Sequence, residues 1–318
     1  MTTQLRMGTL GLGAAALGNL YAEMTDDDAH AIVAGMWDGG VRYFDTAPHY
    51  GLGLSERRLG QALASYRRDE YLISTKIGRL LEPNPGGTGM DVSFVVKADQ
   101  RRRWDFTRDG VLRSLEDSLA RMSLDRVDVL YIHDPEDHLE VAIEQALPAL
   151  VELRESGVVA AIGVGSTNVS AITAVIETGG IDIAMVAGRY TLLEQPANAQ
   201  LLPAALRHGV RVVAVGVYNS GLLATPEPDP NSTYEYGAVP PQVLARAQQI
   251  ARICRDHGVA LPHAAVQFPL RHQAVANVTV GIGRPEFVPA TLERAGTEVP
   301  QELWASLAAE GLIPPAAG

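Results

Sequence analysis

The chain has 318 residues, of which 47% are hydrophobic and 20% are charged. This composition supplies the apolar side chains of a large core and excludes a disordered protein. The formal net charge of -11 argues against nucleic acids and anionic membranes as partners, because both are bound by basic patches.

Short apolar runs rich in β-branched residues predict eight strands. Continuous apolar runs, unlike alternating ones, indicate strands that are buried on both faces, as in a parallel sheet. The runs lie near 8–13 and at 41–46, 71–76, 127–133, 160–166, 181–187, 211–217 and 277–282.

Amphipathic segments between these runs predict helices. Thr25, followed by three aspartates, is typical of an N-cap with acidic residues in the first turn, and this helix is expected to reach about Asp38, before Gly39 and Gly40. Further helices are expected at 54–64, 107–122, 139–157, 169–178, 197–208 and 240–257.

The alternation of strands and helices predicts an α/β fold, a (β/α)8 TIM barrel formed by a single domain over residues 1–318. The length agrees with this prediction, because such barrels take ~250 residues plus insertions. An open doubly wound sheet is the alternative. It is weakened because no G-x-G-x-x-G motif follows the first strand.

Two long segments, 79–106 and 218–239, interrupt the repeat. Both follow a strand, so we expect loops on the carboxyl-terminal face of the barrel, where long loops form lids and pocket walls. The basic run Arg101–Arg103 in the first segment is interpreted as a solvated loop surface rather than a phosphate site.

The chain contains one cysteine, Cys254, in a stretch with helical apolar periodicity. We expect a packed helix residue there and no internal disulfide, which fits a reducing cytoplasm. The N-terminus lacks the pattern of a signal peptide, and no uncharged apolar run reaches the ~20 residues that span a bilayer. A soluble cytoplasmic protein is therefore expected, and no metal site.

Polar residues at the ends of three successive predicted strands identify a candidate active site. Asp45, followed shortly by Tyr50, ends the second strand, Lys76 ends the third and His133 ends the fourth. Barrel enzymes carry their active sites at this end of the strands. Taken singly, each residue also has a structural explanation, but the set favours a site.

These four residue types suit proton exchange with a hydroxyl or carbonyl. A free tyrosine has a pKa near ~10, and a nearby ammonium such as that of Lys76 is expected to lower it. Asp45 is expected to neutralise the buried Lys76, and His133 to hydrogen-bond the reacting oxygen.

The motif D-T-A-x-x-Y-G-x-x-x-S-E at 45–56, with STKIGR at 74–79 and YIHD at 131–134, resembles the aldo-keto reductase superfamily. Segments 188–195, 218–223 and 266–272 resemble a bacterial branch that contains L-fucose dehydrogenase, D-threo-aldose 1-dehydrogenase and pyridoxal 4-dehydrogenase. The resemblance implies that the four residues form a catalytic tetrad with Tyr50 as the acid or base. It also implies NAD or NADP as the hydride-exchanging cofactor.

Cofactor contacts are implied at several further positions. A serine-asparagine pair would bind the carboxamide, an aromatic residue would stack on the nicotinamide, and a glycine-rich loop near the end would hold the adenosine phosphate. Where many relatives carry a basic residue in that loop, this chain has glycine, which favours NAD over NADP. The expected cofactor residues are Ser166, Asn168, Tyr218, Gly221, Leu223, Gly281, Gly283 and Arg284.

Polar and aromatic residues on or near the strand-end loops are expected to form the substrate pocket: Tyr21, His49, Trp104 and Arg189. Trp104 would either stack on a sugar ring or anchor its loop. Arg189 would bind the cofactor or have a structural role. Such a mixture suits a polyhydroxylated substrate.

The expected function is NAD(P)-dependent oxidation of an aldose at C1 to a lactone. The alternatives are NADPH-dependent reduction of an aldehyde or ketone, oxidation of pyridoxal, or a non-catalytic nucleotide-sensing barrel, against which the intact tetrad argues. The expected partners are a small sugar or carbonyl compound, and the expected assembly is a monomer or a small homo-oligomer.

Overall fold

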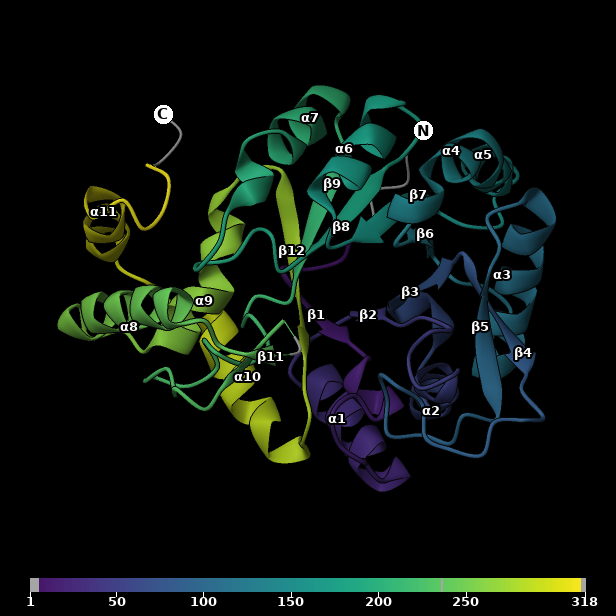
Figure 1. Cartoon of the computed structure of the whole chain (residues 1–318), viewed down its shortest axis with the longest axis horizontal. Helices are drawn as coiled ribbons and strands as arrows, with labels where there is room; N and C mark the ends of the chain where they lie inside the picture. The colour runs from purple at the N-terminus through teal and green to yellow at the C-terminus, as the bar shows by residue number, and fades with distance from the viewer. Residues whose placement is uncertain (1–5, 236, 316–318) are drawn as a thin grey trace.

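A computed structural model describes residues 6–235 and 237–315. Within these residues, eight parallel strands close into a barrel in the order β1-β12-β9-β8-β7-β6-β3-β2. Figure 1 shows the strands at the centre of the molecule and the helices around them. The predicted TIM barrel is confirmed, and the open sheet is excluded. The barrel strands are β1 (Leu10–Gly13), β2 (Tyr43–Asp45), β3 (Leu72–Ile77), β6 (Val129–His133), β7 (Ala161–Ser166), β8 (Ile183–Ala187), β9 (Arg211–Val215) and β12 (Val275–Gly281).

Two of the helices begin at threonine caps that the sequence provides. The Thr25 side chain accepts a hydrogen bond from the main-chain N–H of Asp28, and that of Thr107 accepts one from Gly110. Each cap satisfies a main-chain donor at the start of its helix. The helices up to the seventh strand are α1 (Asp26–Asp38), α2 (Leu54–Leu63), α3 (Arg108–Met122), α4 (Leu139–Val141), α5 (Leu147–Glu155), α6 (Val169–Glu177) and α7 (Leu201–His208).

The single helix predicted over 139–157 is interrupted. A π-helical segment, Ala142–Ala146, joins α4 to α5. Pro148 lies in the first turn of α5 and lacks the N–H that would continue the regular α-helical pattern. The prediction is therefore right about the helical segment and wrong about its continuity.

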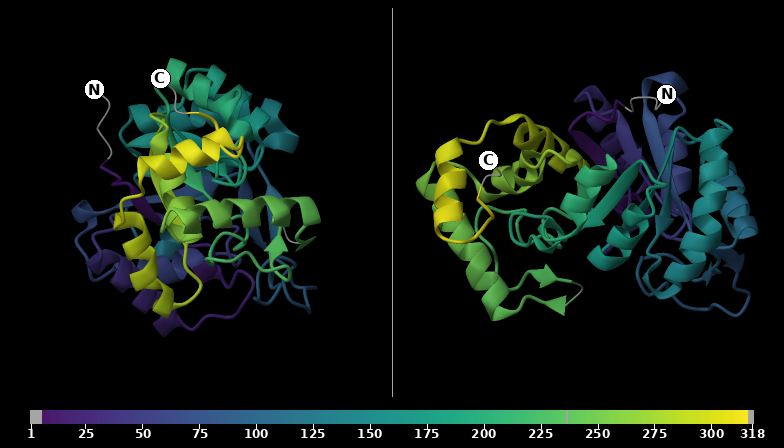
Figure 2. Two further views of the ribbon diagram at one scale, coloured as in Figure 1. Left: turned by 90° about the vertical axis from the view of Figure 1, so that its left-hand side faces the viewer. Right: turned by 90° about the horizontal axis from the view of Figure 1, so that it is seen from above.

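The C-terminal helices gather on one side of the barrel, as the green-to-yellow part of Figure 2 shows. Cys254 is fully buried on the first of them, which confirms a packed helix residue. Among the described residues, no helix is both long and apolar enough to cross a membrane. The last three of these helices were not predicted from the sequence. The group comprises α8 (Pro241–Asp256), α9 (Leu261–Gln267), α10 (Val288–Gly296) and α11 (Gln301–Ala309).

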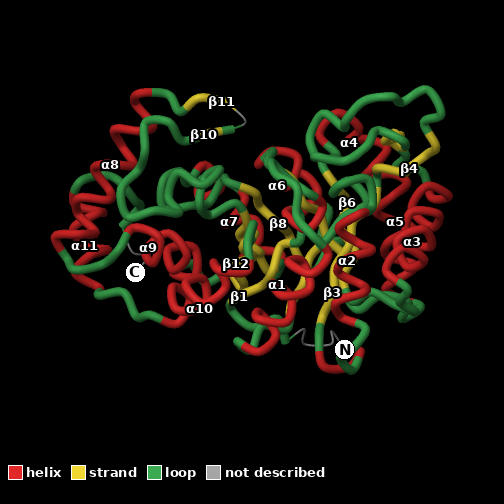
Figure 3. The backbone as a smooth tube through the Cα atoms, turned by 90° about the horizontal axis from the view of Figure 1, so that it is seen from below, coloured by secondary structure: helices red, strands yellow, loops and turns green. Residues whose placement is uncertain are grey.

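Both long segments contain hairpins, so the prediction of plain loops is wrong in part. Strands β4 (Arg79–Pro83) and β5 (Gln100–Trp104) pair antiparallel, and so do β10 (Thr233–Tyr234) and β11 (Gly237–Ala238). Figure 3 shows the two hairpins at the same end of the barrel, on opposite sides. Both follow barrel strands, β3 and β9, so they stand on the carboxyl-terminal face, as expected.

The basic run 101–103 belongs to β5 rather than to a loop, although Arg101 is exposed to solvent as expected. Arg103 pairs with Glu82 across the hairpin at 2.5 Å. Arg102 pairs with Asp91 at 2.5 Å and also donates to the main-chain carbonyl of His49. Because its side chain is only 18% exposed, Arg102 ties the hairpin to the barrel mouth instead of facing solvent.

Alternation along the strands decides which side chains enter the barrel. Tyr43, Val129 and Tyr131 belong to a small apolar cluster inside the barrel, while their neighbours Phe44 and Leu130 join the large core beneath the helices. Side chains two residues apart share a face of a strand. By the same alternation, the polar side chains at the ends of β2, β3 and β6 point to the inside of the barrel, at its mouth.

Candidate active site

A buried ion pair joins two neighbouring strands at the barrel mouth. The Lys76 Nζ donates to the Asp45 Oδ2 at 2.6 Å and to the carbonyl of Thr46 at 2.9 Å. Ser74 donates to the other carboxylate oxygen of Asp45 at 2.7 Å. Asp45 and Lys76 are 3% and 1% exposed, so each charge needs the other to remain ionised. The expected pairing of these two residues is present.

The pairing also sets the protonation of the lysine. Burial alone would lower the pKa of Lys76, but the negative charge of Asp45 and the phenol of Tyr50 shift it the other way, and the net pKa lies above the ordinary value. Lys76 is therefore a permanent positive charge beside Tyr50 at neutral pH.

Tyr50 lies in the turn between β2 and α2, held by a close main-chain contact. A β-carbon on Gly18 would lie 2.7 Å from the carbonyl carbon of Tyr50. A β-carbon on Gly51 would lie 2.3 Å from the carbonyl oxygen of Gly18. Glycine at both positions lets the two segments touch. This contact positions the Tyr50 ring with its centroid 4.9 Å from the Lys76 Nζ.

Burial and Lys76 act on the pKa of Tyr50 in opposite directions. Burial raises the pKa of Tyr50 above its ordinary 10.0, and this outweighs the opposite effect of the Lys76 charge and hydrogen bond. The predicted effect of Lys76 on the pKa of Tyr50 is present, and burial, which the sequence did not reveal, opposes it. Lys76 acts in the predicted direction but does not dominate.

Two histidines stand beside Tyr50. Ring centroids of His133 and Tyr50 are 5.9 Å apart, and His49 lies 5.9 Å from His133. Burial, followed by the charges of Arg79 and Arg102, lowers the pKa of His49 to about 2. Burial, with Lys76 next, lowers the pKa of His133 well below its ordinary 6.5. Both imidazoles are thus neutral hydrogen-bonding groups, suited to orient a substrate oxygen.

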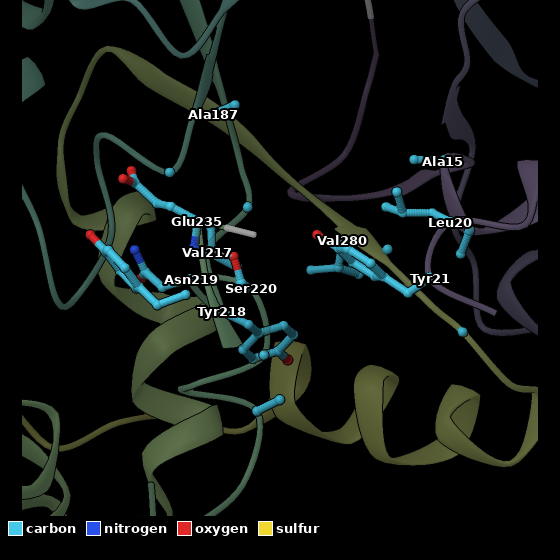
Figure 4. Close-up of a pocket in the computed structure, with 18 of the residues that line it drawn as sticks. Ala15, Leu20, Tyr21, Ala187, Val217, Tyr218, Asn219, Ser220, Glu235 and Val280 are labelled. Carbon is cyan, nitrogen blue, oxygen red and sulfur yellow. Dashed lines mark hydrogen bonds between the residues drawn. The ribbon is translucent and has the colours of Figure 1, made fainter. Parts of the chain in front are cut away.

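A cleft of about 740 Å³ opens over the ends of β1, β8, β9 and β12. In Figure 4, Ala15, Leu20 and Tyr21 lie on one side of it, and Asn219, Ser220 and Glu235 on the other. The cleft has the size of a site for a large organic ligand. It collects six of the residues expected to bind cofactor or substrate: Tyr21, Arg189, Tyr218, Gly221, Gly281 and Gly283.

The glycines of this cleft fit a nicotinamide dinucleotide. A β-carbon on Gly188, Gly221 or Gly283 would meet no atom within 4 Å. The main chain is therefore open at these positions, and a flat ring or a phosphate can approach it closely. Tyr218 adds an aromatic face, and Arg294 lies 5.8 Å from the centroid of its ring.

The other expected residues lie outside the lining of this cleft. The Ser166 hydroxyl donates to Glu136 at 2.9 Å, and the Asn168 side chain caps α6 by accepting from Ala171. Leu223 is fully buried in the core, and Arg284 lies 3.7 Å from Glu286 on the surface. His49 stands beside the tetrad, and Trp104 is on β5, 40% exposed. The sequence did not resolve these placements.

Four notable residues near the site were absent from the sequence-based set: Arg79, Asp134, Asn219 and Glu235. Asp134 directly follows the strand that carries His133, and Arg79 lies two residues after the end of the strand that carries Lys76, so the strand-end criterion could have found them. Asn219 and Glu235 lie in the segment recognised only as a long loop. The pairing of Glu235 with Arg189 depends on a hairpin that the sequence did not reveal.

Comparisons with known proteins agree with this geometry. The model of the Aldo/keto reductase family matches residues 9–309, which confirms the predicted resemblance. D-threo-aldose 1-dehydrogenase of a Pseudomonas species is 50% identical over 98% of this chain and 96% of its own length. Pyridoxal 4-dehydrogenase of Microbacterium luteolum is 36% identical over the same shares. The solved glycerol dehydrogenase from Gluconobacter oxydans superimposes with a TM-score of 0.79 at 22% identity, covering 99% of this chain and 95% of its own.

Proposed function

The chain belongs to the aldo/keto reductase family of oxidoreductases, and from that premise we propose that it oxidises an aldose at C1 to a lactone with NAD. The observation that carries the proposal is the 50% identity, over nearly the whole chain, to a protein named D-threo-aldose 1-dehydrogenase. The geometry of Asp45, Tyr50, Lys76 and His133 supports it, because these side chains meet at the mouth of a closed barrel.

Each of these residues has a defined task in the oxidation. The Tyr50 phenolate accepts the proton of the C1 hydroxyl, and the C1–O bond becomes a carbonyl as the C1 hydride leaves. NAD, when bound, supplies the acceptor for that hydride. Lys76 stabilises the phenolate, Asp45 keeps Lys76 in place, and neutral His133 hydrogen-bonds the substrate oxygen without protonating it.

We assign the cofactor to the glycine-lined cleft, with Tyr218, Gly221, Gly281 and Gly283 along its wall. Ser166, Asn168, Leu223 and Arg284 remain proposed contacts at its margins. Two features support NAD over NADP. Gly283 offers no charge, and Arg284 has the carboxylate of Glu286 beside it at 3.7 Å. A 2′-phosphate there would have to compete with this carboxylate for the guanidinium.

The substrate is proposed to lie between the tetrad and the residues Tyr21, His49, Trp104 and Arg189. Arg189 lines the cleft and pairs with Glu235, so its role there includes holding the β10–β11 hairpin. Oxidation of pyridoxal is the second candidate function, because a relative named pyridoxal 4-dehydrogenase is 36% identical.

Initial rates test the proposal directly. The purified enzyme is assayed with NAD or NADP against a panel of aldoses and pyridoxal, and with NADH or NADPH against simple aldehydes and ketones. We expect the highest kcat/KM with NAD and an aldose. A strong preference for NADPH and carbonyl compounds would refute the oxidation of sugars. A preference for pyridoxal would establish the second candidate.

We further propose a cytoplasmic enzyme that is a monomer or a small homo-oligomer. The single cysteine of the sequence and its burial in α8 support a chain that needs no disulfide. Light scattering of the purified protein measures its mass, and a large assembly would contradict the second part of this proposal.

A further inference from the structure

A second ion pair borders the tetrad. Arg79 is the first residue of β4, three positions after Lys76, and Asp134 directly follows His133. The Arg79 Nη2 donates to the Asp134 Oδ2 at 2.5 Å. The side chains are 14% and 23% exposed, so the pair is largely withdrawn from water. Neither residue belongs to the tetrad.

The carboxylate of this pair lies next to the reacting centre. The Asp134 Oδ2 is 3.5 Å from the Nε2 of His133, the residue proposed to hold the substrate oxygen. The main chain of Asp134 has a φ of 45°, in the left-handed region that a residue with a β-carbon rarely adopts. Its N–H donates to the carbonyl of Gly165 on β7 at 2.9 Å. This unusual conformation turns Asp134 away from the regular course of the strand.

The guanidinium of the pair is fixed from a second direction. The Arg79 Cζ lies 4.4 Å from the centroid of the Trp104 ring, and Trp104 stacks on Phe106 at 5.7 Å. A guanidinium held over an aromatic face keeps its donors in a defined plane. Trp104 is 40% exposed, so the same platform also offers apolar surface at the barrel mouth.

We propose that Asp134 and Arg79 form a subsite for the C2 hydroxyl of the aldose, the hydroxyl next to the reacting carbon. This inference rests on the proposed function. When the C1 oxygen contacts Tyr50 and His133, the two neighbours of C1 are C2 with its hydroxyl and the ring oxygen. A hydroxyl both donates and accepts, which matches a carboxylate beside a guanidinium.

The same chemistry orients the sugar. The ring oxygen has no proton to donate, so it is a poor neighbour for the Asp134 carboxylate. The subsite therefore selects the orientation that places C2, rather than the ring oxygen, beside Asp134. A carbonyl compound that lacks a hydroxyl at the adjacent carbon leaves the carboxylate without this partner.

The test compares an aldose with its 2-deoxy analogue in the wild-type enzyme and in the variants Asp134→Asn and Asp134→Ala. Hydrogen bonds to charged groups correspond to about a 10- to 100-fold difference, so we expect the wild-type kcat/KM to be lower by that factor for the 2-deoxy sugar. The measured quantity is the ratio of kcat/KM for the aldose to kcat/KM for its 2-deoxy analogue. Asp134→Asn keeps a neutral acceptor and should reduce this ratio, and Asp134→Ala should bring it close to unity.

Arg103→Gln is the matched control, because Arg103 is on the same hairpin but pairs with Glu82 and Asp105. It should keep the wild-type ratio. If Asp134→Ala fails to fold, the double variant Asp134→Asn/Arg79→Gln removes both charges together and should show the same loss of discrimination.

Two outcomes would overturn the subsite. One is a wild-type enzyme that does not distinguish the aldose from its 2-deoxy analogue. The other is an Asp134→Ala enzyme whose activity falls equally on both sugars, which would make the ion pair structural. If the wild-type enzyme oxidises no aldose, the proposed function fails instead. The ratio is then measured for reduction of a 2-hydroxyaldehyde against the plain aldehyde, where a ratio near unity overturns the subsite as well.

Discussion

The two halves of the barrel mouth differ in what their strands present. The ends of β2, β3 and β6 carry the buried polar side chains of Asp45, Lys76 and His133, and an ion pair with hydrogen bonds joins the first two. At β8, β9 and β12 the residues at or just after the strand ends are small, among them Gly188 and Gly281. These strand ends leave an open cleft. The first half is filled with polar side chains, and the second half is hollow.

On the proposed function, this difference separates the chemistry from the binding of the cofactor. In the filled half, each side chain is fixed by its neighbours before any ligand arrives, as electrostatic preorganisation requires. In the hollow half, the open main chain and an aromatic ring offer a surface to a flat ligand. Changes in the filled half should therefore alter kcat, and changes in the cleft should alter the affinity for the cofactor.

The strongest test of this separation is Tyr50→Phe. Without the phenolic oxygen, the enzyme has no group to accept the C1 proton, and kcat should fall by about 10²- to 10⁴-fold. Fluorescence titration should show a nearly unchanged Kd for NAD, because Tyr50 does not line the cleft. Tyr66→Phe, a change on a ring that stacks on Trp37, is the control and should retain activity. Surviving turnover in Tyr50→Phe would disprove the assignment of the acid or base.

A second test removes the charge beside Tyr50. Lys76 lowers the pKa of Tyr50 against the effect of burial, so Lys76→Met should raise this pKa further. Oxidation requires the phenolate, and its rate should then rise with pH only at higher values. At neutral pH we expect a loss of about 10- to 100-fold, since one pKa unit corresponds to a factor of ten.

The pH profile of kcat distinguishes this effect from misfolding. Lys97→Met, at an exposed position, should keep the wild-type profile. The double variant Asp45→Asn/Lys76→Met avoids an unpaired buried carboxylate and should fold, with a profile shifted in the same direction by less, because Asp45 raises the pKa of Tyr50. An unshifted profile in both variants would show that Lys76 does not act through Tyr50.

The filled half was predictable from the sequence because its signals are local. Each barrel strand is a short apolar run, and all eight were found with ends displaced by one or two residues. Strand alternation and parallel order then bring Asp45, Lys76 and His133 to one end of the barrel. No long-range information was needed beyond the closure of the barrel.

The features that the sequence did not predict depend on distant contacts or on burial. Strand β5, with the sequence QRRRW, does not resemble a strand by composition. Its arginines are held by ion pairs, Arg103 with Glu82 and Arg102 with Asp91. The net pKa shift of Tyr50 depends on how completely its ring is enclosed, which residue spacing does not reveal.

The hollow half was harder to predict because the same residue types serve local structure and ligand binding. Asn168 begins a helix, and its side chain accepts from the N–H of Ala171 as an ordinary N-cap does. The sequence pattern of a cap and that of a cofactor contact are the same at this position. Glycines likewise occur both in turns and where the main chain is open to a ligand. At Gly283 the structure distinguishes the two, because an added β-carbon there would meet no atom within 4 Å.

The cleft is tested by Gly283→Arg. Its φ lies outside the left-handed region, and an added β-carbon meets no atom within 4 Å, so the change should fold without strain. A cation there should favour a 2′-phosphate and shift the preference toward NADP by about 10-fold, with kcat on NAD nearly unchanged. Gly237→Arg, on the edge of the β10–β11 hairpin, is the control. A change in kcat without a change in cofactor preference would contradict the separation of the two halves.

The smallest expected effect concerns the dry environment of the filled half. The unfolded chain protonates His49 below pH 6.5, its ordinary pKa, whereas the folded protein keeps it neutral down to about 2. Within this window the unfolded state binds more protons, so acidification lowers the free energy of unfolding, by at most about 1.4 kcal/mol per pH unit for one such group.

His49→Phe removes this titration and keeps an aromatic ring against Phe94. Its Tm should fall less than that of the wild type between pH 6.5 and pH 5, while His30→Phe, at an exposed position, should follow the wild type. Identical acid dependence in all three proteins would show that water reaches His49, and that the filled half is wetter than its packing indicates.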